Sequence, residues 1–474
     1  MLCLTLPRSH ARRRRARLAA TAGAVTLLVA AAAAGPVATA GAAAPWTAPA
    51  AVPNAPTTAP TVAFSAGGVG VITGDAGGGA SSGAVGPHTF GTVADDEDAF
   101  PRPMVAFTAT NFALGDRIAL YGLGRIVGLG THFSSADNRA GIVFGDAGDK
   151  LTNVHFVGPP DRTGAAQALA ANNRGDVAGT FGVCANAACV HQSLYLVVRP
   201  AGGSIRPSLR LDNVAVGNIS TVAVNARGDV LVAWQANGGV FARIRTAGGT
   251  LYKTERLGNP REPVRAISGV LTSNRGAAVA WEAQDVDEGT PESPATVDAS
   301  AKAAGASHHF HSAQRLGSVP TLATGQYVGE RAVKLVRSVD GRITAAWTDF
   351  DNDRFVVRTA TLGATRFGTG VQVSDPSVDS VLVDLAAGPS SELAVAWRTG
   401  VAGTDPGTGA PGLDVAFRRP GGTAFAPAEV VEQGSAAHDP TLRFDPASAV
   451  VVAAWNDLQA MRTASRPALV APPG

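Results

Sequence analysis

The stretch NARGDVLVAW, residues 225–234, joins a tight turn to a short apolar strand. Asn and Gly favour the backbone conformations that a turn between two strands requires. The following VLVAW is rich in Val and ends in Trp, a composition typical of a buried β-strand. The turn contains Arg-Gly-Asp, a tripeptide that some extracellular ligands present to receptors. A second copy, NNRGDVAGTF, covers residues 172–181.

This turn-and-strand pattern recurs along the chain. Five strong copies end at Trp234, Trp281, Trp347, Trp397 and Trp455, and three weaker ones end at Gly74, Gly130 and Phe181. Successive ends lie 47 to 66 residues apart, a period near 54. Periods of this length are typical of solenoids, propellers or arrays.

Each repeat contains the pattern of a four-stranded antiparallel sheet. After the strand that ends in Trp comes a variable loop, then a third strand such as VFARIRT (240–246) or LDVAFRR (413–419). A turn with two glycines follows, and then a fourth strand such as LYKTERLG (251–258). One such sheet has two apolar faces, and stacking sheets radially buries both. The repeats therefore predict an all-β fold, a single β-propeller of eight four-stranded blades. Seven is the alternative, because the first two repeats are degenerate.

The two ends of the chain are predicted to share a blade. WTAPAAVPNAPTTAPTVAF (46–64) parallels FAPAEVVEQGSAAHDPTLRF (425–444), and both segments close on Pro-Thr-x-x-Phe. The last repeat has no convincing fourth strand of its own. We therefore expect the N-terminal segment to supply it, with a closing strand and linker over residues 41–60 and propeller repeats over 61–470.

Residues 1–40 have the layout of a secretory signal peptide. A basic block containing Arg12 to Arg15 precedes an apolar, Ala-rich run, and an Ala-Thr-Ala cleavage site follows at 38–40. Six of the 39 Lys and Arg residues and none of the 37 Asp and Glu residues precede Ala40, so the rest of the chain carries 33 basic and 37 acidic residues, or −4. This balance argues against a nucleic-acid partner. We expect a secreted or cell-wall-associated protein, without a membrane span after cleavage.

The Gly/Asp turns, V-x-A-W strands and R-x-x-G-G turns together resemble those of secreted, Arg- and Ala-rich β-propeller-repeat proteins of high-GC Gram-positive bacteria. The resemblance covers nearly all of the chain after the signal. It implies a propeller fold, and it implies no activity, because that group shares none.

The Arg-Gly-Asp tripeptide is interpreted as architecture. Gly228 and Gly175 lie between first and second strands, where Gly124, Gly276 and Gly341 occupy matching positions in other repeats. Cys184 and Cys189, the two cysteines beyond the signal, are expected to form a disulfide in an oxidising compartment. In the chain-entropy model, closing so short a loop contributes only about 2 kcal/mol.

Candidate ligand-binding residues are acidic. In a propeller blade, the second-to-third loops and the connections between blades share one face of the ring, and here that face carries the irregular segments. The binding candidates on this face are Asp285, Asp287, Glu288, Asp349, Asp351 and Asp353. The D-x-D-x-D spacing of 349–353 leaves a weak possibility of calcium, although Arg354 stands where a Ca²⁺ loop turns at Gly. No cofactor and no catalytic residue is predicted.

The favoured function is a secreted, non-catalytic binding or interaction propeller, a monomer whose partner is an extracellular glycan or protein. A carbohydrate-active hydrolase or lyase is the alternative, since propellers can hold paired carboxylates at the channel mouth. A cell-envelope structural protein is a third possibility. A partner of the acidic face is expected to be cationic, metal-bridged or a polar glycan, and changing Arg227 and Asp229 is expected to leave its binding intact.

Overall fold

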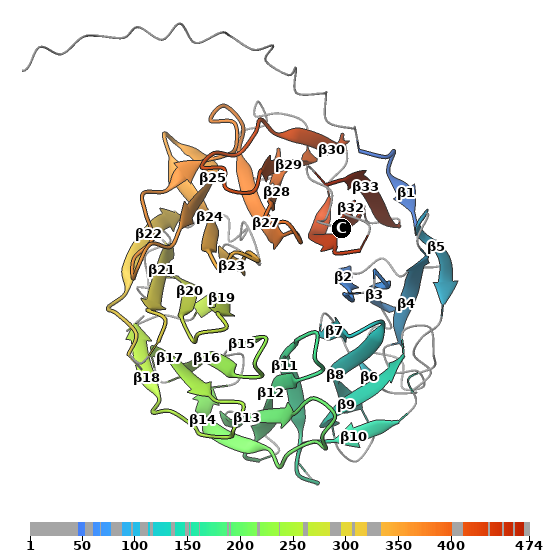
Figure 1. Cartoon of the computed structure of the whole chain (residues 1–474), viewed down its shortest axis with the longest axis vertical. Helices are drawn as coiled ribbons and strands as arrows, with labels where there is room; N and C mark the ends of the chain where they lie inside the picture. The colour runs from blue at the N-terminus through green and yellow to red at the C-terminus, as the bar shows by residue number, and fades with distance from the viewer. Residues whose placement is uncertain are drawn as a thin grey trace, which may run out of the picture. The chain divides into compact units, whose positions relative to one another are not determined.

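The alternation of short apolar strands with tight turns produces eight antiparallel sheets in chain order (Figure 1). The computed structural model describes residues 46–468, apart from 53–59, 67, 77–87, 96–97, 105–111, 114–116, 134–137, 147–150, 152, 161, 187–188, 190, 216–218, 237, 259–263, 285–294, 306–308, 320–332, 401–410, 435–436, 448–449 and 458–459. The expected signal peptide, residues 1–40, lies outside this part of the chain. Within it, no helix is long and apolar enough to cross a bilayer.

Each sheet is a blade with its first strand nearest the centre of the ring (Figure 1). The first strands are β2 (Thr61–Phe64), β6 (Phe112–Ala113) with β7 (Ile118–Tyr121), β11 (Gly164–Ala171), β15 (Ser220–Val224), β19 (Val264–Leu271), β23 (Val333–Arg337), β27 (Ser380–Ala387) and β31 (His438–Asp445). The second strands are β3 (Gly70–Ala76), β8 (Arg125–Phe133), β12 (Val177–Cys184), β16 (Val230–Ala236), β20 (Ala277–Gln284), β24 (Ile343–Asp351), β28 (Leu393–Thr399) and β32 (Val450–Asn456). In the second blade the first strand is split, and both pieces pair with β8.

The outer half of each blade is built from third and fourth strands. The third strands are β4 (His88–Asp95), β9 (Asn138–Asp146), β13 (His191–Arg199), β17 (Gly239–Arg245), β21 (Ala295–Lys302), β25 (Arg354–Thr361), β29 (Gly412–Arg418) and β33 (Met461–Pro467). The fourth strands are β5 (Asp98–Met104), β10 (Val154–Phe156), β14 (Leu209–Ala215), β18 (Glu255–Gly258), β22 (Gln314–Val319), β26 (Val371–Gln372), β30 (Glu429–Gln433) and, in the last blade, β1 (Ala50–Ala51). The chain thus forms eight blades, not seven.

The tryptophans that end the second strands hold adjacent blades together. Trp234, Trp281, Trp347, Trp397 and Trp455 are each at most 1% exposed. Trp281 packs on Leu231 and Val240 of the preceding blade, and the others lie in similar clusters between blades. Small residues leave room for the indole side chains. A Cβ on Gly258, for example, would lie 2.5 Å from Trp281 Cζ2.

The N-terminal segment closes the ring, as the sequence predicts. Strand β1 pairs antiparallel with β33, with Ala51 opposite Arg462. The backbone N–H of Val52 donates to the Met461 carbonyl at 2.8 Å, which extends the pairing by one residue. Val52 and Met461 share a core cluster with Val62 and Ile72 of the first blade. The two ends of the fold are therefore joined through one sheet and one core.

Hairpin turns of two kinds share one face of the ring, as Asp229 shows. Asp229 ends a first-to-second turn, and its Oδ1 accepts a hydrogen bond from the backbone N–H of Ala247, in a third-to-fourth turn, at 2.9 Å. We call this side the turn face. The second-to-third loops and the connections between blades form the opposite side, the loop face.

Candidate binding site

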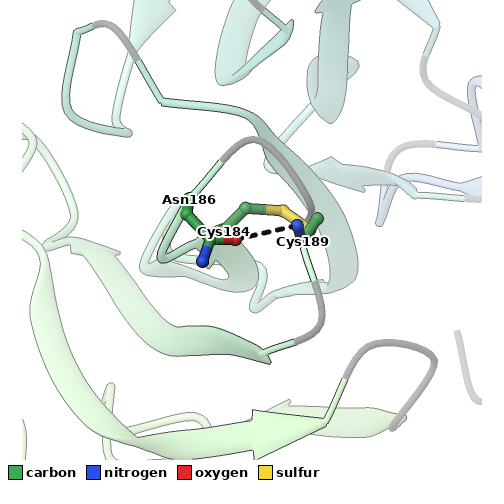
Figure 2. Close-up of a disulfide and its surroundings, with 3 residues drawn as sticks. All are labelled: Cys184, Asn186 and Cys189. Carbon is green, nitrogen blue, oxygen red and sulfur yellow. Dashed lines mark hydrogen bonds between the residues drawn. A yellow bond between two sulfur atoms is a disulfide. The ribbon is translucent and has the colours of Figure 1, made fainter.

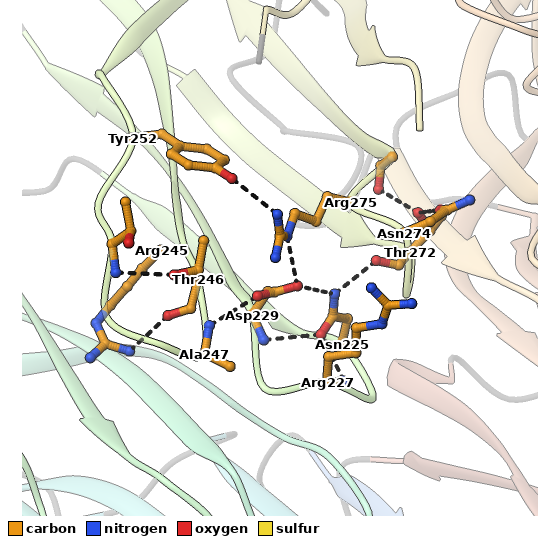
Figure 3. A network of polar contacts seen from close by, with 12 residues as sticks. Asn225, Arg227, Asp229, Arg245, Thr246, Ala247, Tyr252, Thr272, Asn274 and Arg275 are labelled. Atoms are coloured by element: carbon orange, nitrogen blue, oxygen red, sulfur yellow. Dashed lines mark hydrogen bonds and ion pairs between the residues drawn. The ribbon is translucent and has the colours of Figure 1, made fainter. Parts of the chain in front are cut away.

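The Arg-Gly-Asp tripeptide of the fourth blade is a turn (Figure 3). Gly228 has a φ of +86°, which glycine adopts without strain. The Asp229 side chain is buried and accepts hydrogen bonds from Ala247 N–H, Asn225 Nδ2 and Arg275 Nε. Burial opposes ionisation of Asp229, but these three donors outweigh it and hold its pKa below the usual value. A carboxylate that is 1% exposed cannot be presented to a receptor.

The third blade repeats this turn, and the fifth does not. Gly175, with φ +92°, and the buried Asp176 match Gly228 and Asp229. In the fifth blade, the expected match of Gly276 to Gly228 is wrong by one residue. Arg275 takes the left-handed conformation, with φ +66°. Its backbone N–H donates to the Thr272 carbonyl, just as the backbone N–H of Gly228 donates to the Asn225 carbonyl. Gly276 therefore stands where Asp229 stands, and this turn has no carboxylate.

Asparagine side chains link neighbouring turns around the turn face. Asn172 Nδ2 donates to the Asn225 carbonyl at 2.7 Å, and Asn225 Nδ2 donates to the Thr272 carbonyl at 2.8 Å. At the corresponding position of the fifth blade, Thr272 has no amide to continue the series. Its hydroxyl is used within its own turn, with Asn274 Oδ1 and the Gly276 carbonyl. The gap between the fifth and sixth turns is left without this bridge.

A cavity of about 530 Å³ opens at that gap. Its described lining carries four cationic side chains and one carboxylate: Arg227, Lys302, Arg337, Arg342 and Asp340. The charge follows from the turn sequences. The position held by Asp176 and Asp229 in two blades is Gly276 in the fifth and Arg342 in the sixth, as the backbone hydrogen bonds of these turns show. The cavity is cationic because two successive turns lack the acidic residue.

Lys302 forms part of the cavity wall, and it is 2% exposed. It ends β21 opposite Ala277, as Arg245 ends β17 opposite Val230. Its Nζ donates to the carbonyls of Arg275, at 2.9 Å, and Ala303, at 3.3 Å. An ammonium has three N–H donors, so one remains for a ligand. Burial lowers the pKa of Lys302, and the nearby Glu255 carboxylate offsets this effect only in part.

The sixth blade supplies the opposite wall. Asp340 accepts from the Ser338 hydroxyl at 2.5 Å and from Arg342 N–H at 3.1 Å, and its Oδ2 lies 3.5 Å from Arg342 Nε. Burial raises the pKa of Asp340, but these donors more than offset it, so the pKa is lowered. Arg337 Nη1 reaches across to the Ser273 hydroxyl at 3.5 Å. The one carboxylate of the described lining is thus already occupied, and the free groups are donors.

The acidic residues predicted to bind a ligand lie elsewhere. Asp285, Asp287 and Glu288 fall outside the described residues. Asp349 and Asp351 come together on the loop face, where both contact Arg358, at 3.0 Å and 2.6 Å.

Asp353, with φ +61°, forms the turn beyond them. Among the described residues, no group of three or more His, Cys, Asp or Glu side chains is placed to hold a metal ion. Asp349 Oδ1 also accepts from the backbone N–H of Ser318 at 3.0 Å, so this carboxylate fixes adjacent blades to each other.

The two cysteines expected to pair have a structural role. Cys184, the last residue of β12, and Cys189 form a disulfide, and the N–H of Cys189 donates to Asn186 Oδ1 (Figure 2). The bond closes a local loop on the loop face. Its presence in the exported protein stays a prediction.

Asp414 is a half-buried carboxylate of the seventh blade. It stands opposite Trp397 on β28 and Val430 on β30. In the fifth blade, the matching Asp298 pairs with Arg315 at 2.8 Å. Within the described part of the chain, Asp414 has no such arginine, since Val430 takes that place. Burial and the nearby charge of Asp375 raise the pKa of Asp414 to about 6.

Sequence reasoning missed the cationic cavity because it aligned the turns on glycine. Aligning them on the residue that closes each turn would have given Asp176, Asp229, Gly276, Arg342 and Glu392, in which the acidic residue disappears at the fifth and sixth blades. That loss of acid is the signal that was available.

Comparison with known proteins gives likeness of fold only. The chain matches no protein-family model and no curated protein. An ulvan lyase of a new polysaccharide lyase family, bound to -[GlcA(1-4)Rha3S]-, is similar with a TM-score of 0.41 and 9% identity over 73% of this chain and 90% of the lyase. The leech intramolecular trans-sialidase is similar with a TM-score of 0.37 and 8% identity over 66% of this chain and 67% of that one. A Hadza microbial sialidase has a TM-score of 0.36 and 9% identity, and the match covers 61% of this chain and 63% of the sialidase, less than two thirds of its length. These similarities bring no activity to this chain.

Proposed function

We propose that this chain is an exported, non-catalytic binding propeller whose ligand is an anion held in the turn-face cavity between the fifth and sixth blades. The observation that carries the proposal is the charge of that cavity. Arg227, Lys302 and Arg337 form no direct ion pair with a carboxylate among the described residues, while Asp340 contacts Arg342 and Ser338. Cations gathered in a concave site favour a ligand of opposite charge.

The test is binding of acidic and neutral polysaccharides to the purified protein. Affinity electrophoresis with polygalacturonate, chondroitin sulfate and neutral dextran is expected to show retardation by an acidic polymer alone, weakening as salt rises. Lys302→Met is expected to reduce the affinity at least tenfold, about 1.4 kcal/mol. Arg174→Ala is the matched control, because Arg174 holds the position of Arg227 in the third blade and is not among the described residues that line the cavity. The proposal would be contradicted if dextran retarded the protein as much as an acidic polymer does, or if Lys302→Met bound the acidic polymer with unchanged affinity.

The binding site predicted on the loop face is a separate proposal. Its acidic segment, 285–288, lies outside the described residues, and Asp349 and Asp351 are occupied by Arg358. Replacing Asp285, Asp287 and Glu288 together with Ala tests it: binding to a cationic or glycan partner should fall while the melting temperature stays constant.

A second candidate function, carbohydrate cleavage, is favoured by Asp414 and Asp375. The pKa of Asp375 is lowered by hydrogen bonds from Ser377, while that of Asp414 is raised to about 6. Two carboxylates whose environments drive their pKa values apart can serve as base and acid. Two assays decide between binding without turnover and cleavage: hydrolysis of a panel of chromogenic glycosides, and release of unsaturated uronides from acidic polysaccharides. Turnover that Asp414→Asn abolishes would establish cleavage and overturn the non-catalytic proposal.

A further inference from the structure

The cavity surrounds its ligand with cations from three different blades. Arg227 comes from the turn of the fourth blade, Lys302 from the third strand of the fifth, and Arg337 from the first strand of the sixth. One small oxyanion would neutralise one or two of these groups and leave the rest facing each other in a concave site. Like charges held together without a counter-ion repel, so full compensation needs more than one anionic group.

The polar groups of the cavity are almost all donors. The remaining N–H of Lys302, the guanidinium of Arg337 and the amide N–H groups of Asn274 can all donate to a ligand, while Asn274 Oδ1 lies 2.6 Å from the Thr272 hydroxyl. The acceptor oxygens of Asp340 are used within its own turn. A ligand that fits must therefore supply several acceptor oxygens and needs few hydroxyl donors.

Part of the wall is apolar. Val339, which is 68% exposed, lines the cavity together with Leu362 and Ala304. A volume of about 530 Å³ falls within the range of sites for organic ligands and exceeds what a single inorganic anion fills. The ligand should then have a carbon body that covers Val339 as well as charged groups that reach the cations.

Resting on the proposed function, we infer that the ligand is an organic polyanion with at least two separate oxyanion groups, one bound at Lys302 and the other at Arg227 and Arg337. Sulfated or carboxylated saccharides and sugar phosphates both have this chemistry. Arg227, the arginine of the Arg-Gly-Asp turn, is thereby a specificity-determining residue, while the aspartate of the same tripeptide is structural.

Calorimetric titration with matched probes tests this inference. The probes are disaccharides that differ only in carrying no, one or two sulfates, a sugar bisphosphate, and inorganic phosphate. We expect the disulfated disaccharide to bind at least thirtyfold tighter than the monosulfated one, and the unsulfated one not to bind. Comparing the affinity for the sugar bisphosphate with that for the disulfated disaccharide identifies whether the ligand is a sugar phosphate or an acidic saccharide.

Variants assign the two oxyanions to their places. Arg227→Ala should reduce affinity for the dianion about tenfold and leave that for the monoanion unchanged, whereas Lys302→Met should weaken both. Arg174→Ala, the same turn position in the third blade, should change neither. Equal affinity for one and two sulfates would overturn this inference and leave anion binding intact. Absence of binding by every anionic probe would instead overturn the proposed function.

Discussion

The Asp229 side chain connects three separate parts of the fold. Its carboxylate joins the first-to-second turn, the third-to-fourth turn and Arg275 of the next blade. Asp229→Ala would leave Arg275 and the Ala247 N–H without their acceptor. The Arg275 side chain is 35% exposed and can be solvated, so the main cost is the unsatisfied backbone donor, about 1–3 kcal/mol. We expect a clear fall in the melting temperature, measured by differential scanning fluorimetry. Arg227→Ala is the control and should melt like the wild type, because Arg227 is exposed.

Asp414 should make stability depend on pH. Its pKa in the folded protein, about 6, lies above the ordinary 3.8, so its contribution is fully present below pH 3.8 and is lost as the pH rises through 6. Asp414→Asn removes this loss. We expect the variant to match the wild type near pH 4 and to be more stable at pH 7.5, by about 1 kcal/mol once solvent screening of a half-exposed side chain is allowed for. Parallel melting curves at every pH would show that Asp414 ionises freely.

Among the elements, β1 is, with β26, one of the two shortest fourth strands, and it lies far from its partner β33 in the sequence. It completes the last blade through pairing with β33 and through Val52 in the shared core. A chain starting after Val52 would leave β33 as an unpaired edge and expose that core. We expect its melting temperature to fall markedly by circular dichroism. The control begins at Trp46 and should melt like the longer chain, and equal melting of both would refute closure through β1.

The inner strands were predictable from the sequence because the same turn-and-strand pattern recurs in each repeat. Trp281 and its counterparts recur because each must fill the same space between blades, so the strand order could be read from the spacing of the repeats. The closing strand could be read from the likeness of segments 46–64 and 425–444. The boundaries of outer strands could not. LYKTERLG (251–258) predicts a long fourth strand, but β18 covers only Glu255–Gly258. Outer strands pair on one side and pack little, so their composition is weakly constrained.

At the scale of the whole molecule, the sequence predicted the ring and its two faces but not the cavity. The cavity depends on what is missing from two turns: an amide at Thr272 and a carboxylate at Gly276. Such absences are visible only once the register of each turn is known, and Arg275 shifts that register by one residue. Repetition therefore predicts the scaffold, whereas departures from repetition mark the candidate site.

Closure through β1 also imposes an order on how the protein is made. The strand that completes the ring is synthesised first, and its partner β33 follows about 400 residues later. At roughly 5–20 residues per second, the first-made strand waits on the order of 20–80 s for the last-made one. A chain that stops before β33 offers no partner to β1 and cannot close the ring, so closure requires synthesis to have passed Pro467.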